Sequence, residues 1–213
     1  MNADCPTAET AQPTARRSQK ERSDGTISKI VDATIASLLE VGYARTSVKE
    51  VCTRAGVSHG GVFRHFETML DVFMAAADEV AQRQVTLAQA ALQGSAHDPE
   101  PLVAALHHIR DACRSPINAV FYELIVAART DAALHQAMTT FSARYVAAIE
   151  AAAAQVSALA HISPEMRMLL VTSALHLFDG EALTRTVQCF PERETQRMAM
   201  LIQLARLLVP TPL

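Results

Sequence analysis

One short stretch of the sequence, SVKEVCTRAGVSHGGVFRHF, gathers basic, hydroxyl and glycine residues at spacings that suit contact with a polyanion. The start of a helix presents unpaired N–H groups and a partial positive charge, which together bind phosphate. Lysine, arginine and histidine side chains reach phosphates or base edges, and glycines let the backbone approach a surface closely. For any one of these residues, a plain solvated face is the alternative. The residues predicted to contact DNA are Ser47, Lys49, Ser58, His59, Gly60, Gly61, Phe63, Arg64 and His65.

Helix-start and helix-stop residues divide this stretch into two short helices. Ser47 and Glu50 have the spacing of a capping box, and Gly56 stands where the chain must turn sharply. Ser58 is a second helix start, and the helix after it is expected to run through HGGVFRH. A helix, a tight glycine-containing turn and another helix make a helix-turn-helix, whose second helix lies in the major groove of DNA.

The same residues resemble those of a known family, the tetracycline-repressor (TetR) family of bacterial transcription regulators. In that family a long first helix ends in a Gly-aromatic pair, here Gly42-Tyr43, and a motif follows that this chain matches as TSVKEVCTRAGVSHGGVFRHF. The detailed match extends from about Arg22 to Val80. The resemblance implies a homodimer that binds a double-stranded DNA operator, an interface made by the last two helices, and a pocket for a small-molecule effector.

Three positions depart from the family pattern. Phe63 stands where the family often has a tyrosine that holds a phosphate, and Met69 where it often has a lysine. Both changes remove a phosphate contact, and such contacts supply much of the affinity for DNA. Cys52 replaces the usual alanine; we expect a small buried residue there, with a redox switch as the alternative.

The composition favours an all-α fold. The chain has 213 residues, of which 50% are hydrophobic and only 5% aromatic, and just 7 glycines interrupt its helix-favouring residues. We expect about nine helices: an N-terminal three-helix helix-turn-helix domain followed by an α-helical ligand-binding and dimerisation domain. The expected bounds are a disordered basic arm at 1–22, the DNA-binding domain at 23–84 with its motif at 47–66, and the effector-binding and dimerisation domain at 85–213.

Periodic apolar residues, caps and prolines predict where the helices lie. The fourth helix, capped by Thr68 and Asp71, leaves the DNA-binding domain and enters the rest of the chain. It is therefore the natural mechanical link between the two. The predicted helices span residues 26–41, 48–55, 59–65, 69–92, 102–114, 116–129, 132–159, 164–187 and 191–209.

Charge is distributed unevenly along the chain, whose formal net charge is −3. Between Arg16 and Phe66 basic residues outnumber acidic ones by nine to five, whereas after Phe66 acidic residues outnumber basic ones by 15 to 10. The positive part contains the helix-turn-helix, as binding to nucleic acid requires. The basic arm RRSQKER can lie in the minor groove or remain a solvated tail.

Other classes of protein find little support in the sequence. Its four cysteines are scattered, without metal-site spacing, and no nucleophile–base motif or glycine-rich phosphate loop is present. We therefore expect no catalytic residues, no metal and no cofactor. No uncharged apolar run is long enough to span a membrane, and the first residues do not form a secretory signal, so a bacterial cytoplasmic protein, at the nucleoid when bound to DNA, is expected.

The helix predicted from Pro164 is apolar on two sides, and the last helix is nearly all apolar after Met198. A surface helix in a monomer needs only one apolar stripe, so a second stripe indicates a partner. The alternative is a thoroughly buried helix in a monomer. The residues predicted for a dimer interface are Leu170, Ala174, Leu177, Leu201, Leu204 and Leu208.

The middle helices carry aromatic and aliphatic residues with occasional polar tips, which is typical of a small-molecule pocket and equally of a core. His108 with Asp111, and His176 with Asp179, lie one helical turn apart, which leaves metal ligation as a minor alternative. The residues predicted to line an effector pocket are His108, Phe121, Tyr122, Ile125, Phe141, Tyr145, His176 and Phe178.

Together these observations predict a sequence-specific, DNA-binding transcriptional regulator, a repressor that a small apolar effector releases from a palindromic operator. The first alternative is a DNA-binding dimer without an effector, whose C-terminal part is only a scaffold. The second is a helical enzyme that uses the C-terminal pocket as its active site.

Overall fold

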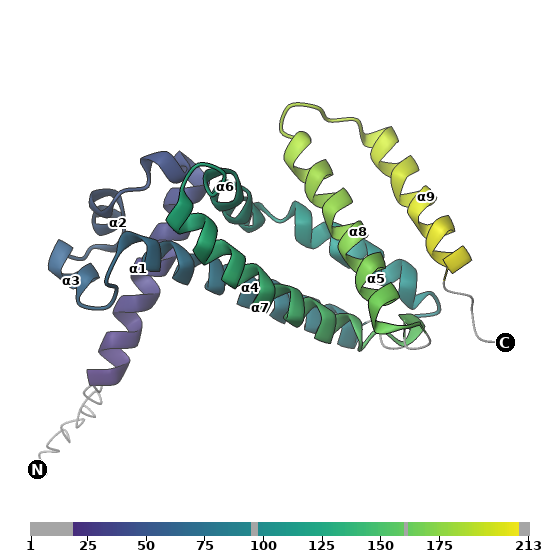
Figure 1. Cartoon of the computed structure of the whole chain (residues 1–213), viewed down its shortest axis with the longest axis horizontal. Helices are drawn as coiled ribbons and strands as arrows, with labels where there is room; N and C mark the ends of the chain where they lie inside the picture. The colour runs from purple at the N-terminus through teal and green to yellow at the C-terminus, as the bar shows by residue number, and fades with distance from the viewer. Residues whose placement is uncertain (1–18, 95–97, 160–161, 209–213) are drawn as a thin grey trace, which may run out of the picture.

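The computed structural model describes residues 19–94, 98–159 and 162–208, and every regular element in these ranges is a helix (Figure 1). The prediction of an all-α fold is confirmed. The N-terminal elements are α1 (Gln19–Val41), η1 (Tyr43–Arg45), α2 (Val48–Ala55), α3 (His59–Phe63) and α4 (Met69–Gly94). The elements that follow are α5 (Pro101–Arg114), η2 (Pro116–Asn118), α6 (Ala119–Ala127), α7 (Ala132–Ala153), η3 (Ser157–Leu159), α8 (Pro164–Thr184) and α9 (Pro191–Leu208).

Every predicted helix is present and most bounds lie within three residues of the prediction, and α1, α6 and α7 differ most. Helix α1 begins at Gln19, so residues 19–22 of the arm expected to be disordered are helical; residues 1–18 lie outside the described ranges. The helix expected from Pro116 starts as the short 3₁₀ turn η2, and α7 ends at Ala153 before another 3₁₀ turn. Within the described ranges, no helix is both long and apolar enough to cross a membrane.

The helix-turn-helix has a small core of its own. Val51 of α2 and Val62 of α3 are fully buried against Ile30 of α1 and Val72 of α4. Met69, which stands where the family often has a lysine, packs on the edge of this core and also on the larger one beside it. The apolar side chain of Met69 therefore contributes to packing α4 against α3.

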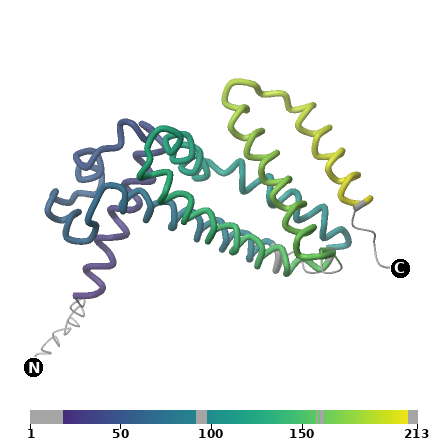
Figure 2. The backbone as a smooth tube through the Cα atoms, in the orientation of Figure 1, coloured from purple at the N-terminus to yellow at the C-terminus, as the bar shows by residue number. Residues whose placement is uncertain are grey.

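A larger core joins this region to the rest of the molecule. It contains Val31 and Leu38 of α1, Phe73 of α4, and residues of α6 and α7 such as Leu124 and Leu134. Helices α4 and α7 lie side by side over most of their length (Figure 2). The expected domain boundary at residues 84 and 85 falls inside α4, so one continuous helix crosses it.

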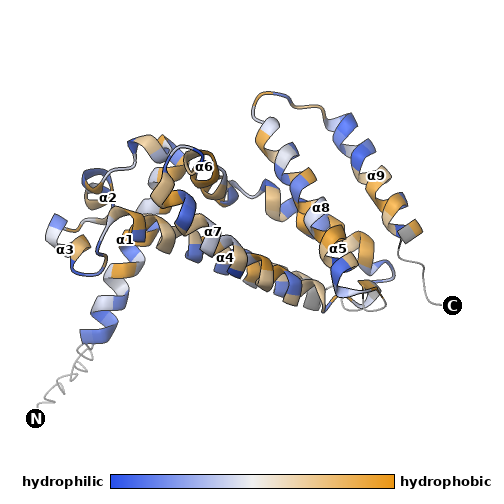
Figure 3. Ribbon diagram, in the orientation of Figure 1, coloured by the Kyte–Doolittle hydropathy of each residue, from blue (hydrophilic) through white to orange (hydrophobic). Residues whose placement is uncertain are grey.

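The far end of the molecule is built from α5, α8 and α9. Phe178 of α8 is 1% exposed and packs with Leu106 of α5 and Met198 of α9. Beside them, Glu181 of α8 is buried between two arginines, Arg114 of α5 and Arg197 of α9. Figure 3 shows apolar residues along both α8 and α9.

Candidate nucleic-acid interface and internal cavity

Capping residues at both ends of α2 determine where this first helix of the motif begins and ends. The Oγ of Ser47 accepts a hydrogen bond from the N–H of Glu50 at 3.3 Å, which satisfies one of the free donors at the start of α2. Gly56 ends the helix in the left-handed region, with φ 66° and ψ 34°, a conformation that glycine adopts without strain. These two residues fix the angle at which the chain leaves α2 toward α3.

Helix α3, the predicted recognition helix, has only 5 residues. The Oγ of Ser58 accepts a hydrogen bond from the N–H of Gly61 at 3.1 Å and so caps its start. The helix ends at Phe63, two residues earlier than predicted, because the N–H of His65 bonds to the carbonyl of Val62 and closes a tighter turn. Arg64 and His65 therefore lie in the turn that follows α3.

The start of α3 presents an open surface. Ser58, His59 and Gly60 are exposed, as are Ser47 and Lys49 on the α2 side. A methyl group added at Gly60 would meet no atom within 4 Å, so nothing in the protein itself requires glycine there. A side chain at this position would project outward, toward any surface that binds the start of α3.

The other predicted contact residues are less open. Phe63 and His65 are half-buried, whereas Arg64 is exposed. The rings of His59 and Phe63 pack against each other with their centroids 4.7 Å apart, which restrains the His59 side chain. Arg54, also in this stretch, is held by Glu50 at 2.6 Å and Glu40 at 2.7 Å, so it connects α2 to α1 instead of facing outward.

A polar joint that was not expected from the sequence links the helix-turn-helix to the later helices. The N–H of Tyr43 donates to Oε2 of Glu123 at 2.9 Å, and its hydroxyl donates to Oδ2 of Asp131, also at 2.9 Å. Burial and the neighbouring Asp131 carboxylate raise the pKa of Tyr43 to about 12. Gly42 has φ 77°, and a Cβ there would come within 2.8 Å of the Glu123 carboxylate. Gly42 and Tyr43 thus hold the segment after α1 against α6 and the start of α7.

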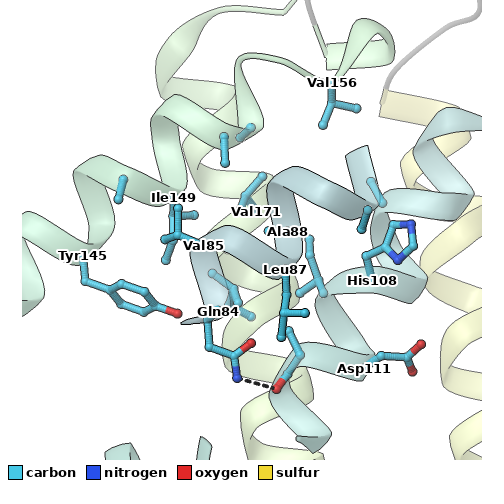
Figure 4. Close-up of a pocket in the computed structure, with 18 of the residues that line it drawn as sticks. Gln84, Val85, Leu87, Ala88, His108, Asp111, Tyr145, Ile149, Val156 and Val171 are labelled. Carbon is cyan, nitrogen blue, oxygen red and sulfur yellow. Dashed lines mark hydrogen bonds between the residues drawn. The ribbon is translucent and has the colours of Figure 1, made fainter. Parts of the chain in front are cut away.

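A cavity of about 430 Å³ that is partly open to solvent lies between α4, α5, α7 and α8. Its wall is mostly aliphatic, with Ala88 of α4, Ile149 and Val156 of the α7 region and Val171 of α8 (Figure 4). The volume lies within the range of known small-molecule sites, roughly 300–1,000 Å³. The polar residues at its wall are Gln84, His108, Asp111, Ser115 and Tyr145.

Two of the eight predicted pocket residues, His108 and Tyr145, line this cavity. The other six do not line it. Phe121 and Phe141 pack at a tilt within the main core with ring centroids 5.6 Å apart, and Phe178 fills the core of α5, α8 and α9. Aromatic residues at helical spacing look alike in a core and in a pocket, so periodicity alone could not separate the two.

The remaining three predicted pocket residues lie elsewhere for different reasons. The Tyr122 hydroxyl donates to Oδ1 of Asp179 at 2.8 Å. Burial is the main cause that raises the pKa of Tyr122, and the Asp179 carboxylate raises it further. Ile125 is 54% exposed on α6, and His176 lies on the exposed face of α8. Among the described residues, no group of three or more His, Cys, Asp or Glu side chains is placed to hold a metal ion.

Gln84 is a buried polar residue of the cavity wall that the sequence did not predict. It lies on the buried stripe of α4 between Val80 and Ala88 and is 5% exposed. A polar residue at a position where the helical pattern requires an apolar one is a signal that could have identified it.

These features define a helix-turn-helix protein with a helical body and a cavity. The model of the bacterial regulatory proteins of the tetR family matches residues 30–76. The HTH-type transcriptional regulator Rv2912c of Mycobacterium tuberculosis is 39% identical over 188 residues, which cover 88% of this chain and 96% of the relative. The chain belongs to the tetR family and is a DNA-binding transcriptional regulator, not an enzyme.

More distant matches support the same class of protein and the same fold. The HTH-type transcriptional regulator CymR of Pseudomonas putida is 29% identical over 57% of this chain and 60% of its own length. A transcriptional regulator from Rhodococcus shares the fold with a TM-score of 0.67 at 23% identity, over 88% of this chain and 99% of that one. The multidrug binding protein EbrR, in complex with imidazole, has a TM-score of 0.63 at 21% identity, over 88% and 96%. The family and fold inferred from the sequence motif are confirmed.

Proposed function

We propose that the chain is a dimeric repressor that binds a palindromic operator through α3 and is released when a small apolar molecule occupies the cavity. The observation that carries this proposal is the path of α4. This helix begins directly after the recognition region and supplies Gln84, Val85, Leu87, Ala88 and Ala91 to the cavity wall. A molecule in the cavity therefore touches the same rigid element that borders α3.

Contacts between α4 and α1 extend this connection. Arg83, the neighbour of Gln84, pairs with Asp32 of α1 at 2.6 Å and with Glu79 on its own helix at 2.7 Å. A ligand shifts the position of α4 only if it binds one arrangement more tightly than the other. A coupling of about 1–3 kcal/mol changes DNA affinity by roughly 5–150-fold.

The DNA-binding surface in this proposal is the exposed start of α3 together with the start of α2. Ser58, His59 and the two glycines after it face the bases or the nearest phosphates. Lys49, Ser47, Arg64 and His65 supply phosphate contacts around them, and Phe63 supports His59 through their ring contact. Phosphate contacts position the protein on the duplex, whereas contacts with base edges carry sequence specificity.

The proposed dimer forms through α8 and α9, but not through the face first predicted. Ala174, Leu177 and Leu201 pack in the intramolecular core, and Leu170 packs on the cluster around Val171. Leu204 is 47% exposed, and the Leu208 side chain lies outside the described residues. The large apolar residues exposed on these two helices are Met166, Leu169, Leu183, Met200, Leu204 and Leu207.

Their arrangement supports a partner surface. On α8, Met166, Leu169 and Leu183 belong to one exposed stripe that also includes His176 and Gly180. Large apolar residues that recur along one exposed helix face support a surface that a partner covers. A dimer also meets the needs of a helix-turn-helix, because two recognition helices about one DNA turn apart, ~34–36 Å, read the two halves of a palindrome.

The role of the cavity is supported by its size and by the solved structures. EbrR carries the description of a multidrug binding protein and was solved with imidazole and with malachite green. A purely scaffolding C-terminal part would have no need for an unfilled space of about 430 Å³ beside α4. We therefore favour an effector over the alternative of a regulator without one.

Fluorescence anisotropy with DNA from upstream of the protein's own gene, at two salt concentrations, tests the DNA-binding proposal. We expect saturable binding that survives an excess of competitor DNA and weakens as salt rises, because binding releases counterions from phosphates. Weak binding that is indifferent to sequence would count against an operator in this DNA. Truncating the probe to one half of the palindrome should abolish most of the affinity.

Sedimentation equilibrium tests the dimer. We expect the wild-type chain, of 23.0 kDa, to sediment at twice that mass, and Leu169→Glu to shift it to the monomer because a charge would be buried in the interface. Ile125→Glu is the matched control, since Ile125 is similarly exposed but lies on α6. A dimer that persists in Leu169→Glu would place the interface on another surface.

A further inference from the structure

The Gln84 side chain is held in one orientation at the cavity wall. Its Nε2 donates a hydrogen bond to the carbonyl oxygen of Ala112 on α5 at 3.3 Å (Figure 4). A carbonyl oxygen accepts hydrogen bonds and cannot donate one, so the amide nitrogen, not the oxygen, must face Ala112. This contact directs Oε1 of Gln84 the other way.

Oε1 of Gln84 has no hydrogen-bond partner among the described residues, although it is shielded from solvent. Buried carbonyl oxygens nearly always have a partner, and an exception calls for a specific explanation. Because Gln84 is 5% exposed and lines the cavity, the missing partner can come from a molecule bound there. Gln84 thus supplies one buried acceptor without a partner at a mainly aliphatic wall, whose other polar residues are His108, Asp111, Ser115 and Tyr145.

The rest of the wall disfavours a charged occupant. No lysine or arginine is found among the described lining residues, so a carboxylate ligand would lack a strong cationic partner. The single carboxylate, Asp111, has a side chain that is 69% exposed and lies 3.9 Å from Arg110. Burial raises the pKa of Tyr145 to about 12, so its hydroxyl stays uncharged near neutral pH.

We propose that the cavity binds a neutral, mainly apolar molecule that donates one hydrogen bond, from a hydroxyl or an N–H group, to Oε1 of Gln84. The regulatory meaning of this binding rests on the proposed function, whereas the binding itself does not depend on DNA. The Gln84 acceptor favours a ligand with a hydrogen-bond donor. The aliphatic side chains of Ala88, Ile149 and Val171 favour a ligand whose body is apolar. Because the described lining residues include no lysine or arginine, an anionic ligand is disfavoured.

Isothermal titration calorimetry of the full chain with three matched probes tests the proposal. Para-cyclohexylphenol donates a hydrogen bond, para-cyclohexylanisole has the same apolar body without the donor, and para-cyclohexylbenzoate carries a negative charge. We expect the phenol to bind about 5–100-fold more tightly than the anisole, because the anisole leaves the Gln84 acceptor unpaired. The benzoate should bind most weakly of the three.

Gln84→Met keeps the length of the side chain and removes the acceptor. In this variant the preference for the phenol over the anisole should fall to about twofold or less. Gln82→Met is the matched control, because Gln82 lies on the same helix two residues earlier and is exposed outside the cavity. It should keep the full preference, and circular dichroism should show both variants folded.

Three results would overturn the proposal: equal affinity for phenol and anisole in the wild-type chain, tightest binding of the benzoate, or no saturable binding of the phenol. A preference that persists in Gln84→Met would also overturn it. Measuring operator affinity with the phenol bound separates the two proposals. A phenol that binds through Gln84 and leaves operator affinity unchanged would contradict the effector step while leaving the ligand class intact.

Discussion

The helix-turn-helix and the helices around the cavity are organised by different kinds of contact. In the first, hydrogen bonds between residues three apart, such as those from Gly61 to Ser58 and from Glu50 to Ser47, set the backbone. In the second, side chains far apart in sequence meet, as when Arg114 binds Glu181 and Glu194. The proposed DNA-binding surface is therefore specified locally, whereas the cavity depends on the assembly of distant helices.

This difference bears on function. A recognition surface must keep its shape in every state of the protein, and local caps with a small apolar core around Val62 provide that. In the proposed function the cavity must respond to its occupant, and the distant contacts around it are the ones that an occupant can alter. The joint at Tyr43 and the continuous helix α4 are the elements that connect the two regions.

The largest effect is expected from breaking the distant contacts of the body. Glu181→Ala removes the closest partner of the Arg114 guanidinium, which keeps Glu194, so the loss should approach but not exceed the roughly 3–5 kcal/mol of a buried ion pair that is broken. Urea unfolding should show this loss. Arg144→Ala is the control, because Arg144 and Asp78 are more than half exposed and such pairs contribute about 0–1 kcal/mol. Equal losses would remove the basis for this contrast.

Acid should weaken the same network. Desolvation raises the pKa of Glu181, but hydrogen bonds from Arg114 and Arg197 outweigh it, so the net pKa lies below the ordinary glutamate value of 4.5. A depressed pKa means that the stabilisation is present above pH 4.5 and is lost as the pH falls below it. Glu181→Ala should flatten this part of the stability–pH curve, and an unchanged curve would contradict the assignment.

A smaller effect is expected at the joint. Tyr43→Phe keeps the ring contact with Phe73 and removes a partly solvated hydrogen bond to Asp131, which should cost about 0.5–1.5 kcal/mol of unfolding free energy. Tyr145→Phe removes the same atom where the described residues offer no hydrogen-bond partner, so its cost should be within about 0.5 kcal/mol. Similar losses in both variants would show that the joint contributes little.

The pKa of Tyr43 adds a second readout at the joint. Because the folded pKa of about 12 is above the ordinary 10.0, the stabilisation is present below pH 10 and declines as the pH rises toward 12. The difference in stability between wild type and Tyr43→Phe should therefore shrink across this range. A constant difference would mean that the hydroxyl does not titrate as its surroundings indicate.

The smallest effect is expected on the DNA side, and it should appear in binding alone. Gly60→Ala meets no atom in the protein, so stability should stay the same or rise by about 0.5–1 kcal/mol, as for other helical glycines. Operator affinity should fall about tenfold, or ~1.4 kcal/mol, if the backbone approaches DNA there. Gly25→Ala, equally open but on α1, should keep full affinity. Unchanged affinity in Gly60→Ala would exclude close approach at this residue.

The same contrast explains which features were predictable. Capping at Ser47 and Ser58 and the sharp turn at Gly56 are local, so the sequence was enough to predict them, and the bounds of α2 agree with the structure. The outward stripe of α8 and the cavity wall depend on which distant helix covers each face. Two apolar sides of α8 gave no reason to prefer Leu169 over Ala174 as the exposed residue.

Operator binding measured with and without a cavity ligand tests the central claim most directly. Fluorescence anisotropy of the full chain on its operator would be recorded alone and with para-cyclohexylphenol at the lowest concentration that fills the wild-type cavity, and again in Gln84→Met at the same concentration. We expect operator affinity to fall by roughly 5–150-fold with ligand in the wild-type chain and by much less in the variant. Equal operator affinity across this ligand and a broad panel of neutral apolar molecules would contradict the claim that the cavity controls α3.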